Sequence, residues 1–242
     1  MATINVITPP HCLSCDGVVT SGAALCAACW LKLTFIEEPV CDALGTPFEY
    51  DQGEGALSAA AIADPPPWDK ARAATAFNDA SKHLIHALKY RDQQEAGIAM
   101  ARMMGQAGRH LIAEADVIMP VPLHWFRLWQ RRFNQSAYLA DRIAAQAGKR
   151  SVVDVLVRAR RTRQQVGLTA EERRRNVRKA FLVAPEKRNL IDGKTVLLVD
   201  DVRTTGATVA VCADVLKAAG AARVHVLTFA LVLEPAHLHI DV

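Results

Sequence analysis

Apolar runs and amphipathic stretches alternate along the chain after residue 70. Short aliphatic runs typical of buried strands lie at about 72–77, 117–119, 152–157, 180–183, 196–199 and 224–232. Apolar residues recur at helical spacing over 79–90, 94–113, 136–146 and 207–219. Strands that alternate with helices predict an α/β domain with a mainly parallel sheet. We assign residues 71–242 to this domain.

The first 70 residues show a different pattern. Residues 51–70 are rich in glycine and alanine and contain three consecutive prolines, Pro65 to Pro67. Consecutive prolines interrupt helices and central strands. We therefore expect a small module over 1–50 and a linker, or connecting arm, over 51–70.

Composition places the chain among globular proteins, since 51% of its residues are hydrophobic and 22% are charged. No apolar run approaches the roughly 20 residues of a membrane span. The first residues lack the basic and apolar regions of a signal peptide. We therefore expect a cytoplasmic protein whose cysteines stay reduced.

The N-terminal module contains two C-x-x-C pairs that are separated by ten residues. The four cysteines are Cys12, Cys15, Cys26 and Cys29. Four thiolates in two tight pairs match a tetrahedral structural zinc site, and disulfides are the weaker alternative in a reducing compartment. Because a module of this size has too little core to fold alone, we expect zinc to supply much of its stability.

Cys41 looks like the start of a third pair, but Leu44 stands where the second cysteine of that pair would be. One cysteine does not complete a further four-thiolate site. Cys41 is therefore either a reserve zinc ligand or a structural residue. We expect Cys212 to be a core residue, because it lies within the predicted helix over 207–219.

The stretch 195–209 predicts a strand, a turn and a helix, with Asp200 and Asp201 at the end of the strand. The turn is rich in hydroxyl groups and pivots on Gly206. Such a loop directs backbone N–H groups and the positive end of a helix dipole at one point, which is typical of a phosphate site. Adjacent carboxylates suit sugar hydroxyls or Mg²⁺. The stretch thus indicates a ribose 5-phosphate site, with an ordinary strand–turn–helix as the alternative.

Neither a P-loop nor a Gly-x-Gly-x-x-Gly fingerprint is present. Instead, Val-Leu-Leu-Val-Asp-Asp-Val-Arg-Thr-Thr-Gly-Ala-Thr resembles the phosphoribosyl-pyrophosphate (PRPP) motif of type I phosphoribosyltransferases. The resemblance implies that Asp200 and Asp201 contact the ribose hydroxyls and that the following loop holds the 5′-phosphate. The residues that it assigns to PRPP binding are Asp200, Asp201, Val202, Arg203, Thr204, Thr205, Gly206, Ala207 and Thr208.

Four further motifs precede this one in a fixed order. They are Pro-Val-Pro-Leu-His-Trp-x-Arg, Arg-Arg-Phe-Asn-Gln-Ser, Arg-x-Arg-Arg-Thr-x-x-Gln and Glu-Glu-Arg-x-x-Asn-Val-x-x-Ala-Phe. Together with the cysteine pairs, they resemble the ComF family over 12–232. The resemblance implies a type I phosphoribosyltransferase-like fold, a small N-terminal zinc-ribbon-like module, and a role in DNA uptake for competence.

Positive charge is concentrated between Arg127 and Lys179, where 15 Lys or Arg accompany 4 Asp or Glu in a chain of net charge +4. Such a segment favours polyanions such as pyrophosphate or a nucleic-acid backbone, with a solvated basic surface as the alternative. The candidates for binding the pyrophosphate are Arg127, Arg131, Arg132 and, more weakly, Lys89. The resemblance also implies a mobile catalytic lid in this segment. Its candidate residues are Arg163, Gln165 and Arg173.

Two classes of function follow. In the first, the chain binds PRPP with Mg²⁺ and transfers the phosphoribosyl group with release of pyrophosphate; the sequence reveals neither the acceptor nor a general base. In the second, it is a non-catalytic single-stranded-DNA-binding component or a PRPP-sensing regulator, acting with other competence proteins. Aromatic residues in and beside the basic segment would suit base stacking, with core packing as the alternative. They are Trp125, Trp129, Phe133 and Tyr138.

Overall fold

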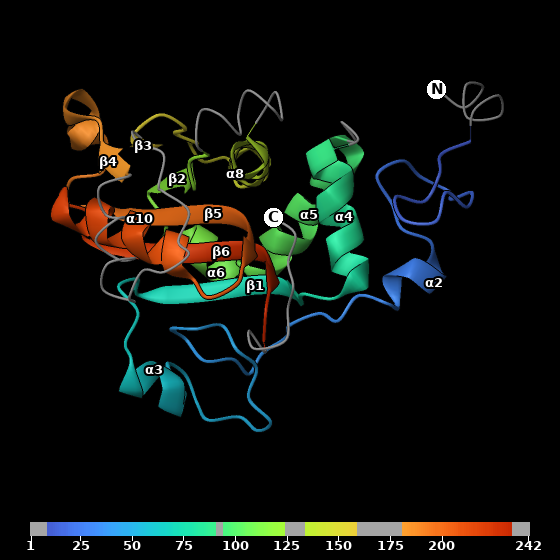
Figure 1. Cartoon of the computed structure of the whole chain (residues 1–242), viewed down its shortest axis with the longest axis horizontal. Helices are drawn as coiled ribbons and strands as arrows, with labels where there is room; N and C mark the ends of the chain where they lie inside the picture. Colours follow the sequence, from blue (N-terminus) through green and yellow to red (C-terminus); the bar gives the residue numbers. More distant parts are fainter. Residues whose placement is uncertain (1–8, 91–93, 124–133, 159–180, 234–242) are drawn as a thin grey trace, which may run out of the picture.

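The computed structural model describes residues 9–90, 94–123, 134–158 and 181–233 (Figure 1). The strands of the α/β domain are β1 (Lys70–Ala76), β2 (Val117–Pro120), β3 (Leu156–Arg158), β4 (Phe181–Val183), β5 (Thr195–Arg203) and β6 (Arg223–Leu231). Its helices are α4 (Asp79–Tyr90), α5 (Gln94–Ala107), α6 (Arg109–Glu114), α8 (Gln135–Gln146), the 3₁₀ helix η1 (Pro185–Leu190) and α10 (Ala207–Ala218).

A four-stranded parallel sheet forms the centre of this domain, in the order β1-β6-β5-β2. Successive residues of β5 enter the cores on opposite faces, as the twofold repeat of a strand requires. Val196 and Leu198 pack in the core that contains α10, whereas Leu197 and Val199 pack in the core that contains α5 and α8. The predicted α/β class with a mainly parallel sheet is therefore confirmed.

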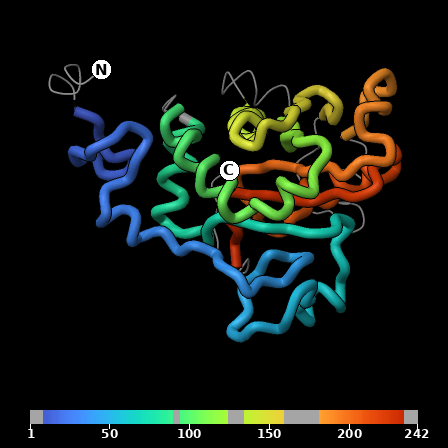
Figure 2. The backbone as a smooth tube through the Cα atoms, turned by 180° about the vertical axis from the view of Figure 1, so that it is seen from behind, coloured from blue at the N-terminus to red at the C-terminus, as the bar shows by residue number. Residues whose placement is uncertain are grey.

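Helices cover both faces of the sheet. α10 lies over one face, and α5, α6 and α8 lie over the other, where Figure 2 shows them from behind. Cys212 of α10 is fully buried against the sheet, as expected of a core residue. This double covering explains why β5 and β6 are long apolar runs rather than alternating strands.

Two parts of the domain differ from the sequence prediction. The single helix expected over 94–113 is broken into α5 and α6 at Gly108, where a Cβ would come within 2.6 Å of the Leu227 side chain. The helix approaches β6 closely at that point, and a residue without a side chain permits it. The runs at 152–157 and 180–183 contribute β3 and β4, which form a separate antiparallel pair outside the parallel sheet.

Residues 9–69 pass along the edge of β1 that faces away from β6 and contain two short helices, α2 (Ala27–Trp30) and α3 (Ala59–Ala63). The N–H of Ala76 donates to Thr34 O at 2.8 Å, and the N–H of Ile36 donates to Ala74 O at 3.1 Å. This short antiparallel pairing satisfies the edge of β1 and fixes the N-terminal segment on the sheet.

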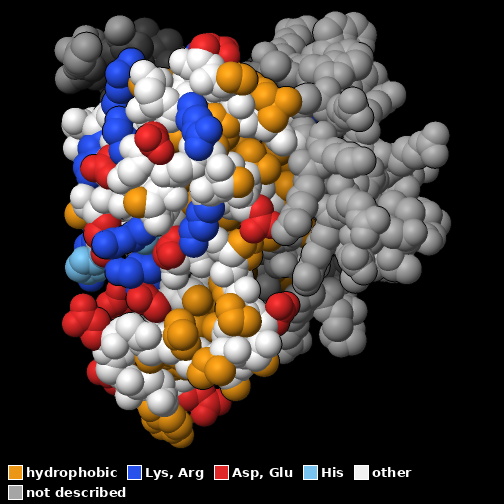
Figure 3. All heavy atoms as spheres, turned by 90° about the vertical axis from the view of Figure 1, so that its left-hand side faces the viewer, with side chains coloured by type: hydrophobic (Ala, Val, Ile, Leu, Met, Phe, Trp, Pro, Cys, Tyr) orange, Lys and Arg blue, Asp and Glu red, His pale blue; other side chains and the backbone are white. Residues whose placement is uncertain are grey.

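Figure 3 shows the side of the molecule that lies on the left of Figure 1, where Lys and Arg side chains lie among Asp and Glu. Lys70 pairs with Glu114 at 2.9 Å, and Lys217 pairs with Asp69 at 3.0 Å. Positive charge near the start of β1 is thus largely balanced by carboxylates.

In the described ranges, none of the helices has the length and apolar character needed to cross a membrane.

Candidate functional site

The loop after β5 leads directly into α10 through Gly206. Gly206 occupies the N-cap of α10 with a left-handed φ of 77°, and a Cβ there would come within 2.9 Å of the Trp68 ring. Glycine meets both constraints without strain. Because Gly206 has no side chain, the N-cap of α10 makes no side-chain hydrogen bond to the first turn, where the positive end of the helix dipole lies.

Hydroxyl groups surround this helix N-terminus. Thr204, Thr205 and Thr208 are exposed. The Thr205 hydroxyl accepts a long hydrogen bond of 3.5 Å from the N–H of Ala207. The loop therefore combines backbone and hydroxyl donors at one exposed point, an arrangement that suits a phosphate.

Asp200 lies in the second half of β5 and is partly buried. Its Oδ1 accepts hydrogen bonds from the Ser136 hydroxyl at 2.8 Å and from the N–H of Asp201 at 2.9 Å. Burial, and after it the charge of the neighbouring Asp201 carboxylate, raise the pKa of Asp200 to about 7, against the opposite effects of the hydrogen bonds from Ser136 and the Asp201 N–H and of the charge of Lys89. Asp200 thus titrates close to neutral pH.

Asp201 points to the last turn of α4. Its Oδ2 lies 2.8 Å from Lys89 Nζ, and its Oδ1 accepts a hydrogen bond from the N–H of Val202 at 2.8 Å. Sequence reasoning assigned Lys89 to the pyrophosphate of PRPP. In the structure, its ammonium group contacts one of the two carboxylates of the same site, and its contact with the pyrophosphate stays a prediction.

Arg203 ends β5, and its side chain turns away from the threonine loop. The guanidinium group donates to the backbone carbonyl of Leu44 and lies over the Trp68 ring, 5.6 Å from its centroid. Only 4% of Arg203 is exposed. Arg203 therefore contributes to the threonine loop, residues 204–208, through its backbone and through the contacts of its side chain with Leu44 and Trp68.

Ser136 is the site residue that sequence reasoning missed. It lies two residues after the N-cap residue Asn134, whose side chain accepts a hydrogen bond from the Ser136 N–H at 3.0 Å. This cap fixes the first turn of α8 and directs the Ser136 hydroxyl to Asp200. Its only signal in the sequence was its position as the last residue of the Arg-Arg-Phe-Asn-Gln-Ser motif.

Six predicted site residues lie outside the described ranges. They are the pyrophosphate candidates Arg127, Arg131 and Arg132 and the lid candidates Arg163, Gln165 and Arg173. The same holds for three of the aromatic residues of the basic segment, Trp125, Trp129 and Phe133.

The cysteine pairs meet in the N-terminal module. The sulfur atoms of Cys12, Cys15, Cys26 and Cys29 all lie within 4.8 Å of one another. Tetrahedral zinc with Zn–S bonds of about 2.3 Å requires sulfur atoms about 3.8 Å apart, and Cys15 and Cys26 have theirs 3.7 Å apart. The described cysteines are free thiols. Their donor set and spacing fit one structural zinc ion.

The surroundings of two of these thiols, Cys29 and Cys12, shift their pKa values in opposite directions. Burial raises the pKa of Cys29 to about 12. For Cys12, burial acts in the same direction, but hydrogen bonds from backbone N–H groups, the strongest from Cys26, lower its pKa to about 6. A zinc ion at this site would stabilise both thiolates, because coordination favours the deprotonated form of each thiol.

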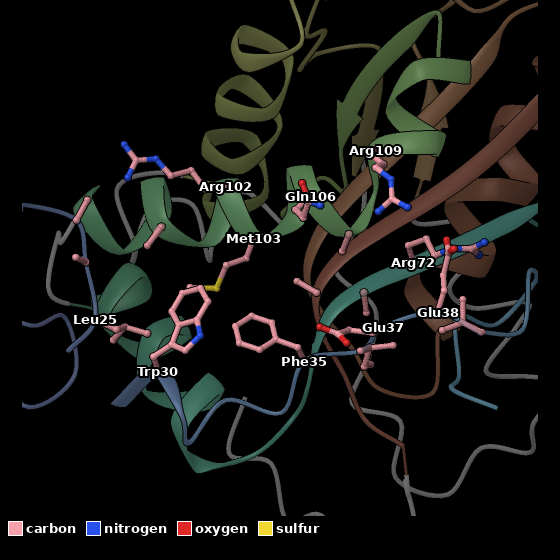
Figure 4. Close-up of a pocket in the computed structure, with 18 residues that line it drawn as sticks. Leu25, Trp30, Phe35, Glu37, Glu38, Arg72, Arg102, Met103, Gln106 and Arg109 are labelled. Atoms are coloured by element: carbon pink, nitrogen blue, oxygen red, sulfur yellow. The ribbon is translucent and has the colours of Figure 1, made fainter. Parts of the chain in front are cut away.

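A cavity of about 720 Å³ separates the N-terminal module from α5. The rings of Trp30 and Phe35 lie 4.8 Å apart at an angle of 38°, with Met103 beside them (Figure 4). Arg102 and Arg109 also line the cavity. Its walls are largely apolar and also carry guanidinium groups and the carboxylates of Glu37 and Glu38, and none of residues 204–208 lines it.

Two family models match the chain. A double zinc ribbon domain matches residues 3–61, and a phosphoribosyl transferase domain matches residues 134–239. The first contains the four clustered cysteines, and the second contains the threonine loop and its carboxylates.

Related proteins align with both parts. The DNA utilization protein YhgH of Salmonella typhi is 36% identical over 67% of this chain and 72% of its own length. YhgH of Escherichia coli (strain K12) is 30% identical over 84% of this chain and 88% of its own length. Competence protein F of Haemophilus influenzae is 28% identical over 89% of this chain and 94% of its own length. The chain therefore belongs to the family of competence protein F and YhgH, in which a double zinc ribbon domain precedes a phosphoribosyl transferase domain.

Proposed function

We propose that this protein binds PRPP together with Mg²⁺ at the end of β5, and that it transfers the phosphoribosyl group with release of pyrophosphate in a process linked to DNA uptake. One observation carries the proposal: Asp200 and Asp201, near the end of β5, are followed directly by the loop at 204–208 and by the N-terminus of α10, which has no side-chain cap. Carboxylates accept hydrogen bonds from sugar hydroxyls, and helix N-termini bind phosphate. A site for sugar hydroxyls next to a site for phosphate matches the arrangement of these groups in ribose 5-phosphate.

Each part of PRPP has a proposed partner. The 5′-phosphate takes the N–H groups and hydroxyls of residues 204–208, and the ribose 2′- and 3′-hydroxyls donate to Asp200 and Asp201. The pyrophosphate is proposed to contact the arginines at 127, 131 and 132, with Lys89 close by at Asp201. Arg163, Gln165 and Arg173 remain proposals for a lid over the bound ligand.

The proposed reaction breaks the bond between C1 of the ribose and the pyrophosphate oxygen, and the pyrophosphate leaves with the electron pair. A nucleophile of the acceptor then forms the new bond to C1. Mg²⁺, when bound, neutralises charge on the leaving pyrophosphate. The chain contributes by holding the ribose in one orientation through two carboxylates and by anchoring the 5′-phosphate far from the reacting carbon.

The first test measures ligand binding by calorimetry. PRPP with Mg²⁺ should bind the wild type and bind the Asp200→Asn/Asp201→Asn double variant at least about 10-fold more weakly, a loss of about 1.4 kcal/mol. Asp141→Asn, at an exposed residue of α8, is the matched control and should bind like the wild type. Equal affinity of wild type and double variant would remove the ribose assignment. A screen of nucleobases and amines for PRPP-dependent pyrophosphate release then tests transfer.

We propose single-stranded DNA as a second ligand, and the cavity beside α5 favours it. Trp30 and Phe35 offer ring faces on which bases stack, and Arg102 and Arg109 offer charge to a phosphate backbone. Relatives named for competence and DNA utilization are consistent with such a ligand. In this proposal PRPP acts as a regulatory ligand, and other competence proteins are partners. We also propose a cytoplasmic location, where thiols remain reduced for zinc.

Fluorescence anisotropy tests this second function. A labelled oligonucleotide should bind with an affinity that falls as salt rises, and Trp30→Ala should weaken binding more than Leu31→Ala at the exposed neighbouring residue. Binding that ignores salt, or equal binding by both variants, would contradict a stacking site in this cavity.

A further inference from the structure

Two loops of the N-terminal segment are closed by backbone hydrogen bonds at equivalent positions. The first loop surrounds the first cysteine pair. In it, the N–H of Cys12 donates to Gly17 O at 2.7 Å, and the N–H of Val19 donates to Pro10 O at 2.9 Å. The N–H of Asp16 also donates back to Cys12 O at 3.2 Å. This is the frame of a zinc knuckle, with its cysteine thiols directed to one point.

The second loop repeats this frame around Cys41. The N–H of Cys41 donates to Thr46 O at 2.8 Å, and the N–H of Phe48 donates to Pro39 O at 2.9 Å. Each of these residues lies 29 positions after its counterpart in the first loop, as Cys41 lies 29 positions after Cys12. The second loop is therefore a structural repeat of the zinc knuckle.

The repeat extends to the short helix that follows each loop. Cys26 is the N-cap of α2, and its N–H donates to Cys12 Sγ at 3.3 Å. Ser58 is the N-cap of α3, and its N–H donates to Cys41 Sγ at 3.2 Å. Ser58 thus takes the place of Cys26. We accordingly extend the N-terminal ribbon through α3 in this proposal.

Only one of the four zinc-ligand positions in the second half carries sulfur. The counterparts of Cys12, Cys15, Cys26 and Cys29 are Cys41, Leu44, Ser58 and Ala61. The Ser58 hydroxyl accepts a hydrogen bond from the N–H of Ala61 at 3.3 Å, and Cys41, Leu44 and Ala61 pack in a small apolar core. A structural zinc site needs four donors, so these residues do not fit a second zinc ion.

The second loop instead makes hydrogen bonds to two side chains that lie against the threonine loop, residues 204–208. The Trp68 Nε1–H donates to Ala43 O at 2.7 Å, and the guanidinium group of Arg203 donates to Leu44 O. Arg203 lies over the Trp68 ring, which also contacts Gly206. Two carbonyl groups of the second loop therefore orient the two side chains on which the turn before α10 rests.

Arg203 depends on this arrangement. Its Nε–H has no hydrogen-bond partner among the described residues, and burial lowers the pKa of the guanidinium group to about 10. A buried cation is stable only when hydrogen bonds or ring faces replace water. Leu44 O and the Trp68 ring supply that replacement. The loop itself is fixed to β1, because Asp42 pairs with Arg72 at 2.7 Å.

We propose that the second half of the ribbon is a metal-free brace for the threonine loop at 204–208, in which Trp68 and Arg203 are positioning residues for the 5′-phosphate. The proposal rests on the proposed PRPP site and assigns a role to the N-terminal domain in it. The brace acts on the loop at 204–208, while the pyrophosphate is held elsewhere. Its loss therefore affects ligands that carry a 5′-phosphate and spares those that do not.

The test compares two ligands in the full chain. Trp68→Phe removes the hydrogen bond to Ala43 O, which is worth about 1 kcal/mol, together with the outer edge of the ring that lies nearest Gly206. We expect about a fivefold weaker affinity for ribose 5-phosphate and an unchanged affinity for pyrophosphate with Mg²⁺. Arg203→Lys should act in the same way. Tyr50→Phe, at an exposed aromatic residue of the N-terminal segment, is the control and should change neither affinity.

Three outcomes separate the proposals. A wild type that binds neither ribose 5-phosphate nor PRPP would overturn the proposed function and the positioning role together. A wild type that binds, with Trp68→Phe binding equally well, would overturn the brace alone. Equal weakening of ribose 5-phosphate and pyrophosphate would also overturn it, since a general loss of folding would then explain the effect.

Metal analysis tests the metal-free half independently of any ligand. We expect one zinc per chain, retained in Cys41→Ala and lost in Cys15→Ala. Two zinc ions per chain, or loss of zinc in Cys41→Ala with the fold intact by circular dichroism, would overturn the assignment of the second half.

Discussion

The ammonium group of Lys89 lies 2.8 Å from the Asp201 carboxylate, and the two side chains are only 15% and 14% exposed. The pair joins the last turn of α4 to the end of β5. It leaves one net negative charge on the two adjacent carboxylates when both are ionised. An anionic ligand therefore meets less repulsion at this site than two unpaired carboxylates would exert.

Replacing Lys89 should discriminate between ligands of different charge. We expect Lys89→Gln to weaken PRPP binding about 10-fold, which corresponds to about 1.4 kcal/mol, and to weaken ribose 5-phosphate binding much less. The physical reason is that the pyrophosphate adds negative charge close to Asp201. Calorimetry with Mg²⁺ measures both affinities. Lys82→Gln, at an exposed residue of the same helix, is the control. An equal loss for the two ligands would contradict the electrostatic role.

The raised pKa of Asp200, about 7 against an ordinary value of 3.8, makes the stability of the fold depend on pH. Between these values the folded state keeps a proton that the unfolded state has released. Stability from this group is therefore lost as pH rises toward 7. Asp200→Asn carries no charge at any pH, so its melting temperature relative to wild type should be higher at pH 8 than at pH 5. In a chain of this length, each kcal/mol corresponds to about 2–4 °C. A difference that is equal at both pH values would refute the titration of Asp200.

Ser136 should set where that titration occurs. Its hydroxyl donates to Asp200 Oδ1 at 2.8 Å, and this bond favours the charged carboxylate. Ser136→Ala should therefore move the pKa of Asp200 upward, as measured by carboxyl carbon chemical shifts across pH. Ser151→Ala is a suitable control, because the Ser151 hydroxyl is buried without a hydrogen-bond partner among the described residues. An unchanged midpoint in Ser136→Ala would mean that the bond does not persist in solution.

Local signals in the sequence sufficed for the main elements of the site. The aliphatic run before Asp200 predicted β5, and the small residues around Gly206 predicted the turn and α10. The cysteine pairs predicted one cluster of four thiols, which the structure contains. In each case the interacting residues are close in sequence, so spacing alone carries the geometry.

Contacts between distant segments were not predictable in this way. The Ser136–Asp200 bond spans 64 positions and the Arg203–Leu44 bond spans 159. Nothing in either local sequence indicates the partner, because the partner is set by the order of strands in the sheet and by the packing of the N-terminal segment. The motif likewise assigned Arg203 to the ligand as one of a consecutive run, whereas its side chain turns toward Trp68.

Removal of zinc should unfold the first half of the ribbon while the α/β domain remains folded. The four thiolates lie in a module with few buried apolar residues, whereas the sheet has its own cores on both faces. Limited proteolysis after treatment with a chelator should therefore cut near residues 12–31 and leave a stable α/β fragment. Cooperative loss of the whole far-ultraviolet signal on chelation would contradict independent cores.

The second half of the ribbon should accept zinc once its donors are restored. Leu44→Cys, Ser58→Cys and Ala61→Cys place sulfur at the three positions that correspond to ligands in the first half, and Cys41 supplies the fourth. We expect the triple variant to bind two zinc ions per chain, because the backbone frame of the knuckle is already present. Leu44→Cys alone should bind one, since two thiolates do not complete a tetrahedral site. Atomic absorption on protein purified under reducing conditions measures the stoichiometry. If the folded triple variant still bound a single zinc, the two halves would not share ligand geometry, and the repeat inferred from their hydrogen bonds would be wrong.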